Sequence, residues 1–500
     1  EAVGATTIAT PIISPLYPTE KRSLSLAWSI YDPANLTDPF LIIDQASSGA
    51  SLVQAFATFG GPTLNLIYAD DLRHIGYHAI GRIPIRGPAV EHPRELPTDA
   101  IPSGAPPPDE DSDSADQPQD TATTATSAAD DEQSNQLPTV DTESTPAPRL
   151  LYNVGSPVSP VPVDALDSTQ QWSGYIPYEQ LPSIIDPPNG VLATANSRIT
   201  PDDYPYYVAD NWADPYRVER ITQLLDGHNH LTPADMLAVQ NDVHSAFDLL
   251  VAQRLAYALD HASPSVLLHD ATRLHQAADL LRKWNGNVTA DSPAAAIAIA
   301  ARAEIWPLLL TPQIAAHDRT KPKDSANEKL AALYHWGEAD TALEKLLSHQ
   351  PTRWLPSSYA NWNDLLATAV STALYTAHAP HDLSTWRYGS YHPVEIAHPV
   401  FGSNSILSRV LGVSTGTGLQ SAPGDGVTIR TSGLHFGPSE RFTADLSNPS
   451  ATSANLATGE SEVPLSPFFL DQFQPWLHGT TLPLPLQAPE ITHTLTLRPN

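Results

Sequence analysis

The chain has 500 residues, a net charge of -29 at pH 7, an isoelectric point near 4.8 and no cysteine. The lack of cysteine excludes disulfides, thiolate nucleophiles and cysteine-bound zinc. The acidic balance argues against nucleic acid and anionic membranes as partners, because both bind clustered Lys and Arg. No stretch is expected to reach the roughly 18 apolar residues of a membrane-spanning helix.

Residues 1–95 are predicted to form a β-rich region with helical pieces. Helical spacing of apolar residues occurs over 51–59. Alternation or short apolar runs, which are typical of strands, occur over 24–31, 41–43, 64–68 and 75–80. The last two runs flank the sequence DDLR and predict a hairpin.

Residues 96–149 form a segment of a different composition. About a dozen acidic residues and no Lys or Arg occur between 99 and 143, among Ser, Thr, Ala, Pro and Gln. Such a segment cannot bury enough apolar surface to offset the entropy of ordering it. We therefore expect a disordered acidic insertion that interrupts the fold and does not mark a domain boundary.

Three regions are predicted after this insertion. Residues 150–215 form a core segment of loops and short strands, residues 216–380 are mainly helical, and residues 381–500 are β-rich with many Gly and Pro turns. Apolar residues at three- and four-residue spacing predict helices over 216–225, 233–259, 272–284, 293–310 and 326–347. A last strand is expected over 491–497.

A series of sequence blocks runs almost the whole length of the chain in a fixed order. The blocks are TPIIS (10–14), LNLIYADDLRHIGYHAIGRIPIR (64–86), WSGYIPYEQLPSIIDPPNG (172–190), TWRYG (385–389), ERFTADL (440–446) and PLSPFFLDQFQPWLHG (464–479). Together they resemble the penicillin acylase family of N-terminal nucleophile hydrolases. The His-Gly that the family often has in the first block is absent here. The resemblance implies an α+β fold, an αββα sandwich of the N-terminal nucleophile hydrolase type with a large helical insertion.

The stretch from 186 to 221 carries the residues that the resemblance assigns to the active site. Asn196 matches the oxyanion asparagine of the family's Ala-Asn-Asn-Arg motif, although the second Asn is Ser197 here. Arg217 matches an arginine that orients this asparagine and the reacting amine. A side-chain amide suits an oxyanion because it donates a hydrogen bond and does not titrate. The alternatives are that Asn196 caps a turn after a strand over 191–195, and that Arg217 pairs with Asp214 or Glu219 on a helix surface. Arg220 is expected to be structural.

Other candidate sites have weaker support. Asp210 lies near the position of a carboxylate that binds a structural calcium ion in the family, but a plain loop carboxylate is the alternative; no other cofactor is required. His228 and His230, beside Asp226, lack a third metal ligand at a fixed spacing. Residues 402–404 (Gly-Ser-Asn) imitate the family's cleavage site but occur too late in the chain, and residues 424–426 (Gly-Asp-Gly) are expected to form a turn.

The resemblance implies hydrolysis of a linear N-acyl amide, such as a penicillin or an N-acyl homoserine lactone, through an acyl-enzyme on an N-terminal serine. That serine is expected upstream, so the chain alone is expected to be inactive. Its expected partners are the acyl-amide substrate and the α-chain and N-terminal β segment of the same precursor, in the periplasm or outside the cell. A non-catalytic binding or scaffold protein that retains the fold is the alternative. A glycosidase with paired carboxylates has only the acidity and ten tryptophans in its favour.

Overall fold

The computed structural model describes residues 11–16, 21–33, 38–88, 155–156, 162–228, 230–268, 270–317, 337–402, 406, 409–410, 412, 414–484, 496 and 498, with the side chains of 314–317 left out. The predicted acidic insertion, 96–149, lies outside these residues. Almost all of the predicted last strand, 491–497, also lies outside them.

A small antiparallel sheet positions the start of the candidate site. It contains β1 (Leu64–Ala69), β2 (Ile75–Ile80) and β5 (Ser183–Ile185), in the order β1-β2-β5. Strands β1 and β2 form the predicted hairpin, in which Leu64 pairs with Ile80. Helix α2 (Gly49–Ala55) packs against this sheet, and the ring of Tyr68 fills the space beside Gly49, where a Cβ atom would lie 2.1 Å from a ring carbon. Any larger residue at position 49 would therefore force the Tyr68 ring to shift.

The remaining strands are short. Strands β3 (Pro84–Arg86) and β4 (Trp172–Tyr175) pair with each other, and β6 (Glu440–Thr443), β7 (Ser453–Leu456) and β8 (Leu482–Pro483) form a third sheet. Two strand predictions are wrong. Among the described residues, the 24–31 stretch has only one β-bridge, from Ser25 to Ile12, and thus no partner strand along its length. The 41–43 run lies in the helix α1 (Phe40–Ile43).

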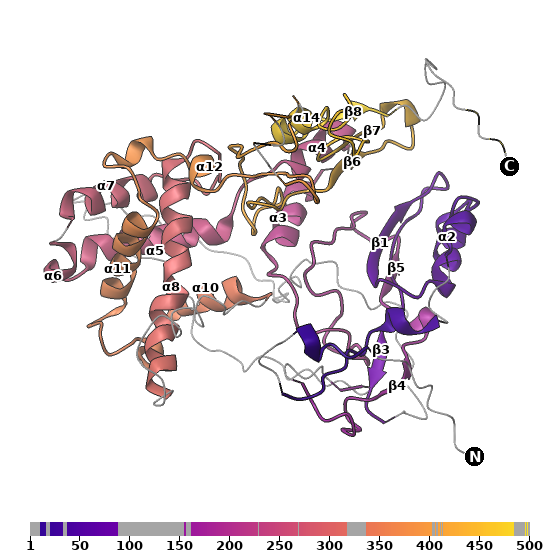
Figure 1. Ribbon diagram of the computed structural model, residues 1–500, viewed down its shortest axis with the longest axis horizontal. Coiled ribbons are helices and arrows are strands. Elements are labelled where there is room, and N and C mark those ends of the chain that lie inside the picture. Colours follow the sequence, from indigo (N-terminus) through magenta and orange to yellow (C-terminus); the bar gives the residue numbers. More distant parts are fainter. Residues whose placement is uncertain are drawn as a thin grey trace, which may run out of the picture.

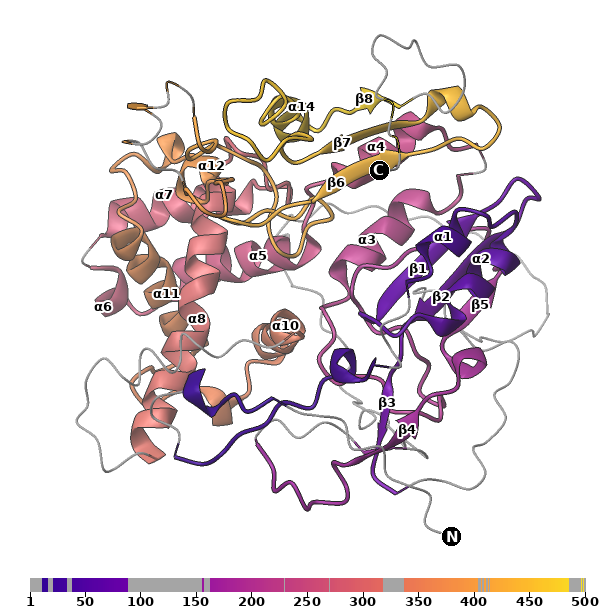
Figure 2. The ribbon, with the colours of Figure 1, turned by 45° about the vertical axis from the view of Figure 1, so that its right-hand side comes forward.

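Most helices lie between residues 216 and 376. They are α3 (Tyr216–Leu225), α4 (Pro233–Gln240), α5 (Ala246–His261), α6 (Pro264–Leu267), α7 (Ala271–Arg282), α8 (Pro293–His317), α10 (Ala339–His349) and α11 (Trp362–Thr376), followed later by α12 (Tyr388–Tyr391) and α14 (Phe473–His478). The largest core cluster is formed mainly by α5, α7, α8 and α11. Figures 1 and 2 show these helices on one side, the β1-β2-β5 sheet on the other, and α3 between them.

Two helix predictions need correction. The expected single helix over 233–259 is two helices, because Ser245 caps α5 by accepting a hydrogen bond from Asp248 N at 3.0 Å and ends the preceding segment. In the described part of the chain, α8 is long and apolar enough over Pro293–Gln313 to cross a membrane, contrary to expectation, although it contains Arg302 and Glu304. Of that window, 61% is buried among the neighbouring helices, which is the pattern of a core helix.

Candidate active site

The segment that carries Asn196 leads from β5 to α3. A turn closed by Gly190 N, which donates to Pro187 O at 2.8 Å, precedes it. Residues 191–195 do not form the expected strand, because no neighbouring strand pairs with them in the described structure. Asn196 has a φ of 65°, in the left-handed region that Asn tolerates better than most residues. The chain therefore does turn at Asn196, as one interpretation predicted.

The side chain of Asn196 is held by Arg217. One Nη atom of Arg217 donates to Asn196 Oδ1 at 2.9 Å and to the backbone oxygen of Ala195 at 2.7 Å. Arginine can only donate, so the atom of the Asn196 amide that faces it is the oxygen. The amide NH₂ of Asn196 is consequently directed away from Arg217. Because the Asn196 side chain is exposed, this NH₂ group is accessible to a ligand as a donor.

Asp214, one of the two alternative partners of Arg217, is engaged elsewhere. Asp214 accepts hydrogen bonds from the backbone and hydroxyl of Thr341, and Arg220 forms a two-bond ion pair with Asp242 at 3.0 and 2.9 Å. The prediction that Arg220 is structural agrees with this pair. Burial lowers the pKa of Arg217 below its usual value, yet a guanidinium keeps its charge at neutral pH. The geometry thus connects Arg217 to Asn196 and not to a surface carboxylate.

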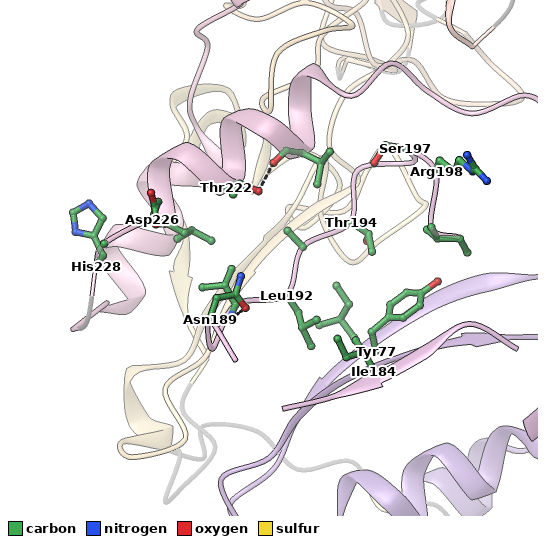
Figure 3. A pocket seen from close by; sticks show the side chains of 17 residues that line it. Tyr77, Ile184, Asn189, Leu192, Thr194, Ser197, Arg198, Thr222, Asp226 and His228 are labelled. Carbon is green, nitrogen blue, oxygen red and sulfur yellow. Dashed lines mark hydrogen bonds between the residues drawn. The ribbon is translucent and has the colours of Figure 1, made fainter. Parts of the chain in front are cut away.

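A pocket of about 150 Å³ opens along the segment that leads to α3 (Figure 3), and it is lined by sequence neighbours of Asn196 and Arg217, not by these two residues themselves. Thr194 and Ser197, which lie on either side of the Ala195–Asn196 pair, form part of its wall, as does Val218, the neighbour of Arg217. Apolar side chains of the sheet and of α3 form much of its lining, and polar groups lie at the end of α3. The remaining lining residues are Ile67, Tyr77, Ile184, Asn189, Val191, Leu192, Ala193, Arg198, Ile199, Thr222, Leu225, Asp226, Gly227 and His228.

Asp210 does not belong to a cluster of acidic or His side chains among the described residues. Calcium takes six to eight oxygen ligands, but within these residues no group of three or more His, Asp or Glu side chains surrounds a common point. Asp210 is exposed. Burial lowers the pKa of Arg86, and the negative charge of Asp210 opposes this decrease. Nearby Asp202 pairs with Arg198 at 2.6 Å. A calcium-binding role of Asp210 stays a prediction.

The three doubtful motifs of the sequence lie outside this arrangement or at its edge. His228 and His230 are both exposed, and His228 lines the rim of the pocket. Gly402 is described, but Ser403 and Asn404 lie outside the described residues. The Gly-Asp-Gly turn contains Asp425, which is buried and has a structural partner that the sequence did not indicate.

That partner is Arg302, in a buried cluster of three charged residues. Arg302 of α8 donates to Asp248 of α5 at 2.5 Å and to Asp425 at 2.7 Å. Two carboxylates thus face one guanidinium, which would leave an excess negative charge in a buried place. Burial raises the pKa of Asp248 to about 7, with Asp425 contributing and Arg302 opposing. Sequence spacing gives no sign of this cluster, because its members lie 54 and 123 residues apart.

Comparison with known structures identifies the class of protein to which this fold belongs. A thermostable penicillin G acylase from Alcaligenes faecalis matches 94% of this chain and 74% of its own, with a TM-score of 0.51 and 13% sequence identity. The overall fold is therefore that of penicillin G acylase, an N-terminal nucleophile hydrolase, which confirms the predicted α+β class. At this identity the likeness concerns the fold alone.

The family follows from the sequence comparisons. The family model described as penicillin amidase matches residues 5–493, and the chain belongs to this family. A penicillin acylase 2 proenzyme from Pseudomonas sp. (strain SE83) is 27% identical over 338 residues, and an acyl-homoserine lactone acylase QuiP from Pseudomonas fluorescens (strain Pf0-1) is 24% identical over 356 residues. Each match covers 65% of this chain and 40% of the relative. The chain thus spans about two fifths of the length of these curated relatives.

Proposed function

We propose that the protein containing this chain hydrolyses linear N-acyl amides, with Asn196 as an oxyanion donor and Arg217 as the residue that orients it. The observation that carries this proposal is the Arg217–Asn196 hydrogen bond, which directs the amide NH₂ of an exposed asparagine away from its own protein partner. A donor held in this way is suited to a carbonyl oxygen that gains negative charge. The curated relatives named as acylases support the same reaction class.

The proposed reaction needs a nucleophile from another part of the protein. A serine hydroxyl attacks the amide carbonyl carbon, its proton passes to the serine's own α-amine, and the oxyanion accepts a hydrogen bond from Asn196. The C–N bond then breaks, the amine leaves with the proton, and water hydrolyses the acyl-enzyme. The matched region is 40% of the relatives' length, which is consistent with a serine supplied outside it.

The pocket beside Asn196 supports a substrate with an apolar substituent. Tyr77, Ile184, Val191 and Leu225 present apolar surface next to the segment that carries the oxyanion donor. A dry cavity of about 150 Å³ in another protein holds one benzene molecule, which sets the size of the group that fits. Penicillins and N-acyl homoserine lactones, the substrates in the relatives' names, are both N-acyl amides, and we propose this class for the protein.

The experiment is an amidase assay on protein expressed from the complete gene, with phenylacetyl and longer acyl amides of a chromogenic amine. The proposal expects release of the amine with an initial burst that marks the acyl-enzyme, and its loss in Asn196→Ala with folding intact. Unchanged turnover in Asn196→Ala would remove the oxyanion assignment. A folded wild-type protein that binds but never cleaves these amides would favour the non-catalytic alternative.

A further inference from the structure

We infer that the N-terminal end of α10 positions the Asn196–Arg217 pair, and that Asp214 and Thr341 are the residues that connect the two. The expected effect on turnover rests on the proposed function, whereas the positioning of Asn196 and Arg217 by α10 does not. Figure 2 shows α10 between the helical cluster and α3. Helix α10 therefore lies where a contact from its N-terminal end can fix the position of the start of α3.

Asp214 caps α10 from outside that helix. The N-cap residue of α10, Glu338, makes no side-chain cap hydrogen bond of its own. Asp214 Oδ1 instead accepts from Thr341 N at 2.8 Å, the backbone donor that an N-cap side chain ordinarily binds, and from the Thr341 hydroxyl at 2.5 Å. A carboxylate at this position is also favoured by the positive end of the helix dipole. The two segments are 127 residues apart in sequence.

Backbone contacts continue from Asp214 to the candidate catalytic residues. Asp214 N donates to Gly337 O at 3.0 Å, and the preceding residue, Ala213, donates from its N to Asn196 O at 2.9 Å. Arg217 follows Asp214 within one helical turn. The capping contact therefore holds a short segment that contacts Asn196 on one side and presents Arg217 on the other.

Two further contacts fix the same junction. Gly337 N donates to Asn211 Oδ1 at 2.7 Å, and a Cβ atom at Gly337 would lie 1.8 Å from the backbone oxygen of Trp212. Only glycine permits this approach, because backbone atoms cannot move aside as a side chain can. Tyr216, next to Arg217, donates its hydroxyl to Glu344 of α10.

The test compares Thr341→Val with Thr341→Ser in protein expressed from the complete gene. Both variants keep the backbone donor, but only Ser keeps the hydroxyl that Asp214 binds. A small displacement of a catalytic group can cost up to about 100-fold in rate, and for the loss of this one bond we expect about a 10-fold lower kcat in Thr341→Val with KM little changed. Thr341→Ser should stay within about two-fold of wild type. Equal rates in both variants and wild type would overturn the inference.

A double-mutant cycle separates positioning from general stabilisation. If α10 acts through Arg217, Thr341→Val should lower kcat no further in an Arg217→Ala background, because coupled effects do not add. Full additivity of the two losses would overturn the inference. A residue with a merely structural role would lower the melting temperature in both backgrounds while leaving kcat per active site, measured by titrating the acyl-enzyme, unchanged.

Hydrogen exchange tests whether α10 holds the segment with Asn196 and Arg217 in place, even if the protein cleaves no amide. Gly337→Ala should increase deuterium uptake in peptides that cover 195–217, and Gly426→Ala should not, because a Cβ atom at this exposed glycine meets nothing within 4 Å. Wild-type uptake in Gly337→Ala would overturn the inference. Increased uptake together with an inactive wild type would refute the proposed function and leave the positioning role of α10 standing.

Discussion

Arg217 donates through a single Nη atom to the side-chain oxygen of Asn196, at 2.9 Å, and to the backbone oxygen of the residue before it, at 2.7 Å. The first bond holds the amide oxygen, so the amide NH₂ is directed away from Arg217. The second bond fixes the backbone just before Asn196. Because both come from one guanidinium, the orientation of Asn196 depends on the placement of α3.

Replacing Arg217 by Lys should lower kcat by about 10-fold or more while the protein remains folded. An ammonium is a point charge without the planar set of donors of a guanidinium, so it cannot hold two acceptors in the same fixed geometry. Steady-state kinetics on active-site-titrated enzyme measures the effect. Arg282→Lys, at an exposed ion pair with Asp260, is the control and should keep the wild-type rate. A wild-type kcat in Arg217→Lys would show that Asn196 is oriented by other groups.

Filling the pocket should weaken substrate binding. Val191 lines it and is partly exposed, so Val191→Trp adds volume without removing core packing. We expect KM for an apolar acyl amide to rise about 10-fold, which is the loss of roughly 1.4 kcal/mol of binding. Leu419→Trp adds the same side chain at a position that is 65% exposed and does not line the pocket. If the two variants have the same KM, the substrate lies elsewhere.

The stability of the helical region should fall as the pH rises from about 4 to 7. The pKa of Asp248 is about 7 in the folded protein, against an ordinary value of 3.8 for an aspartate in an unfolded chain. Over this interval the folded state keeps a proton that the unfolded state has lost, so the stabilisation is complete below pH 3.8 and is lost as the pH approaches 7.

Asp248→Asn mimics the protonated carboxyl group and should therefore lose less stability over the same range. Melting temperatures at pH 4.5 and 7.5 measure the difference, with the exposed Asp260→Asn as the control. An identical pH dependence in Asp248→Asn and wild type would mean that Asp248 is ionised throughout.

Removing the cation of the buried cluster should lower the free energy of unfolding far more than removing an exposed cation. Arg302→Leu leaves Asp248 and Asp425 buried without their shared partner, a change that typically costs about 3–5 kcal/mol. Arg282→Leu breaks exposed pairs and should cost about 1 kcal/mol or less. Denaturant unfolding gives both values. Equal losses would contradict a structural role for the Arg302 cluster.

Local patterns in the sequence were enough to predict several elements, and the family resemblance indicated the two candidate catalytic residues. The β1-β2 hairpin and α3 follow from alternation and helical spacing, and Asn196 and Arg217 follow from one contiguous motif. Their hydrogen bond spans only 21 residues. Both residues lie in a segment where a family motif can be recognised directly.

The parts that sequence reasoning missed depend on distant partners. The sequence does not indicate that Asp214 caps α10, because Thr341 is 127 residues away and no local motif connects the two residues. The stretch over 24–31 has the pattern of a strand, but a strand also needs a partner, and alternation alone cannot supply one. The sequence predicts only a turn at Asp425, because its ion pair with Arg302 follows from the packing of α8.

Asn196→Asp is the sharpest test of whether the amide NH₂ of Asn196 donates to the oxyanion. Aspartate has the same shape and keeps an oxygen for Arg217, but it has no donor to offer a negatively charged oxygen. The measurement is kcat of folded, active-site-titrated protein from the complete gene. We expect kcat to fall by about 100- to 1,000-fold with the melting temperature unchanged. A kcat within about two-fold of wild type would show that Asn196 is not the oxyanion donor.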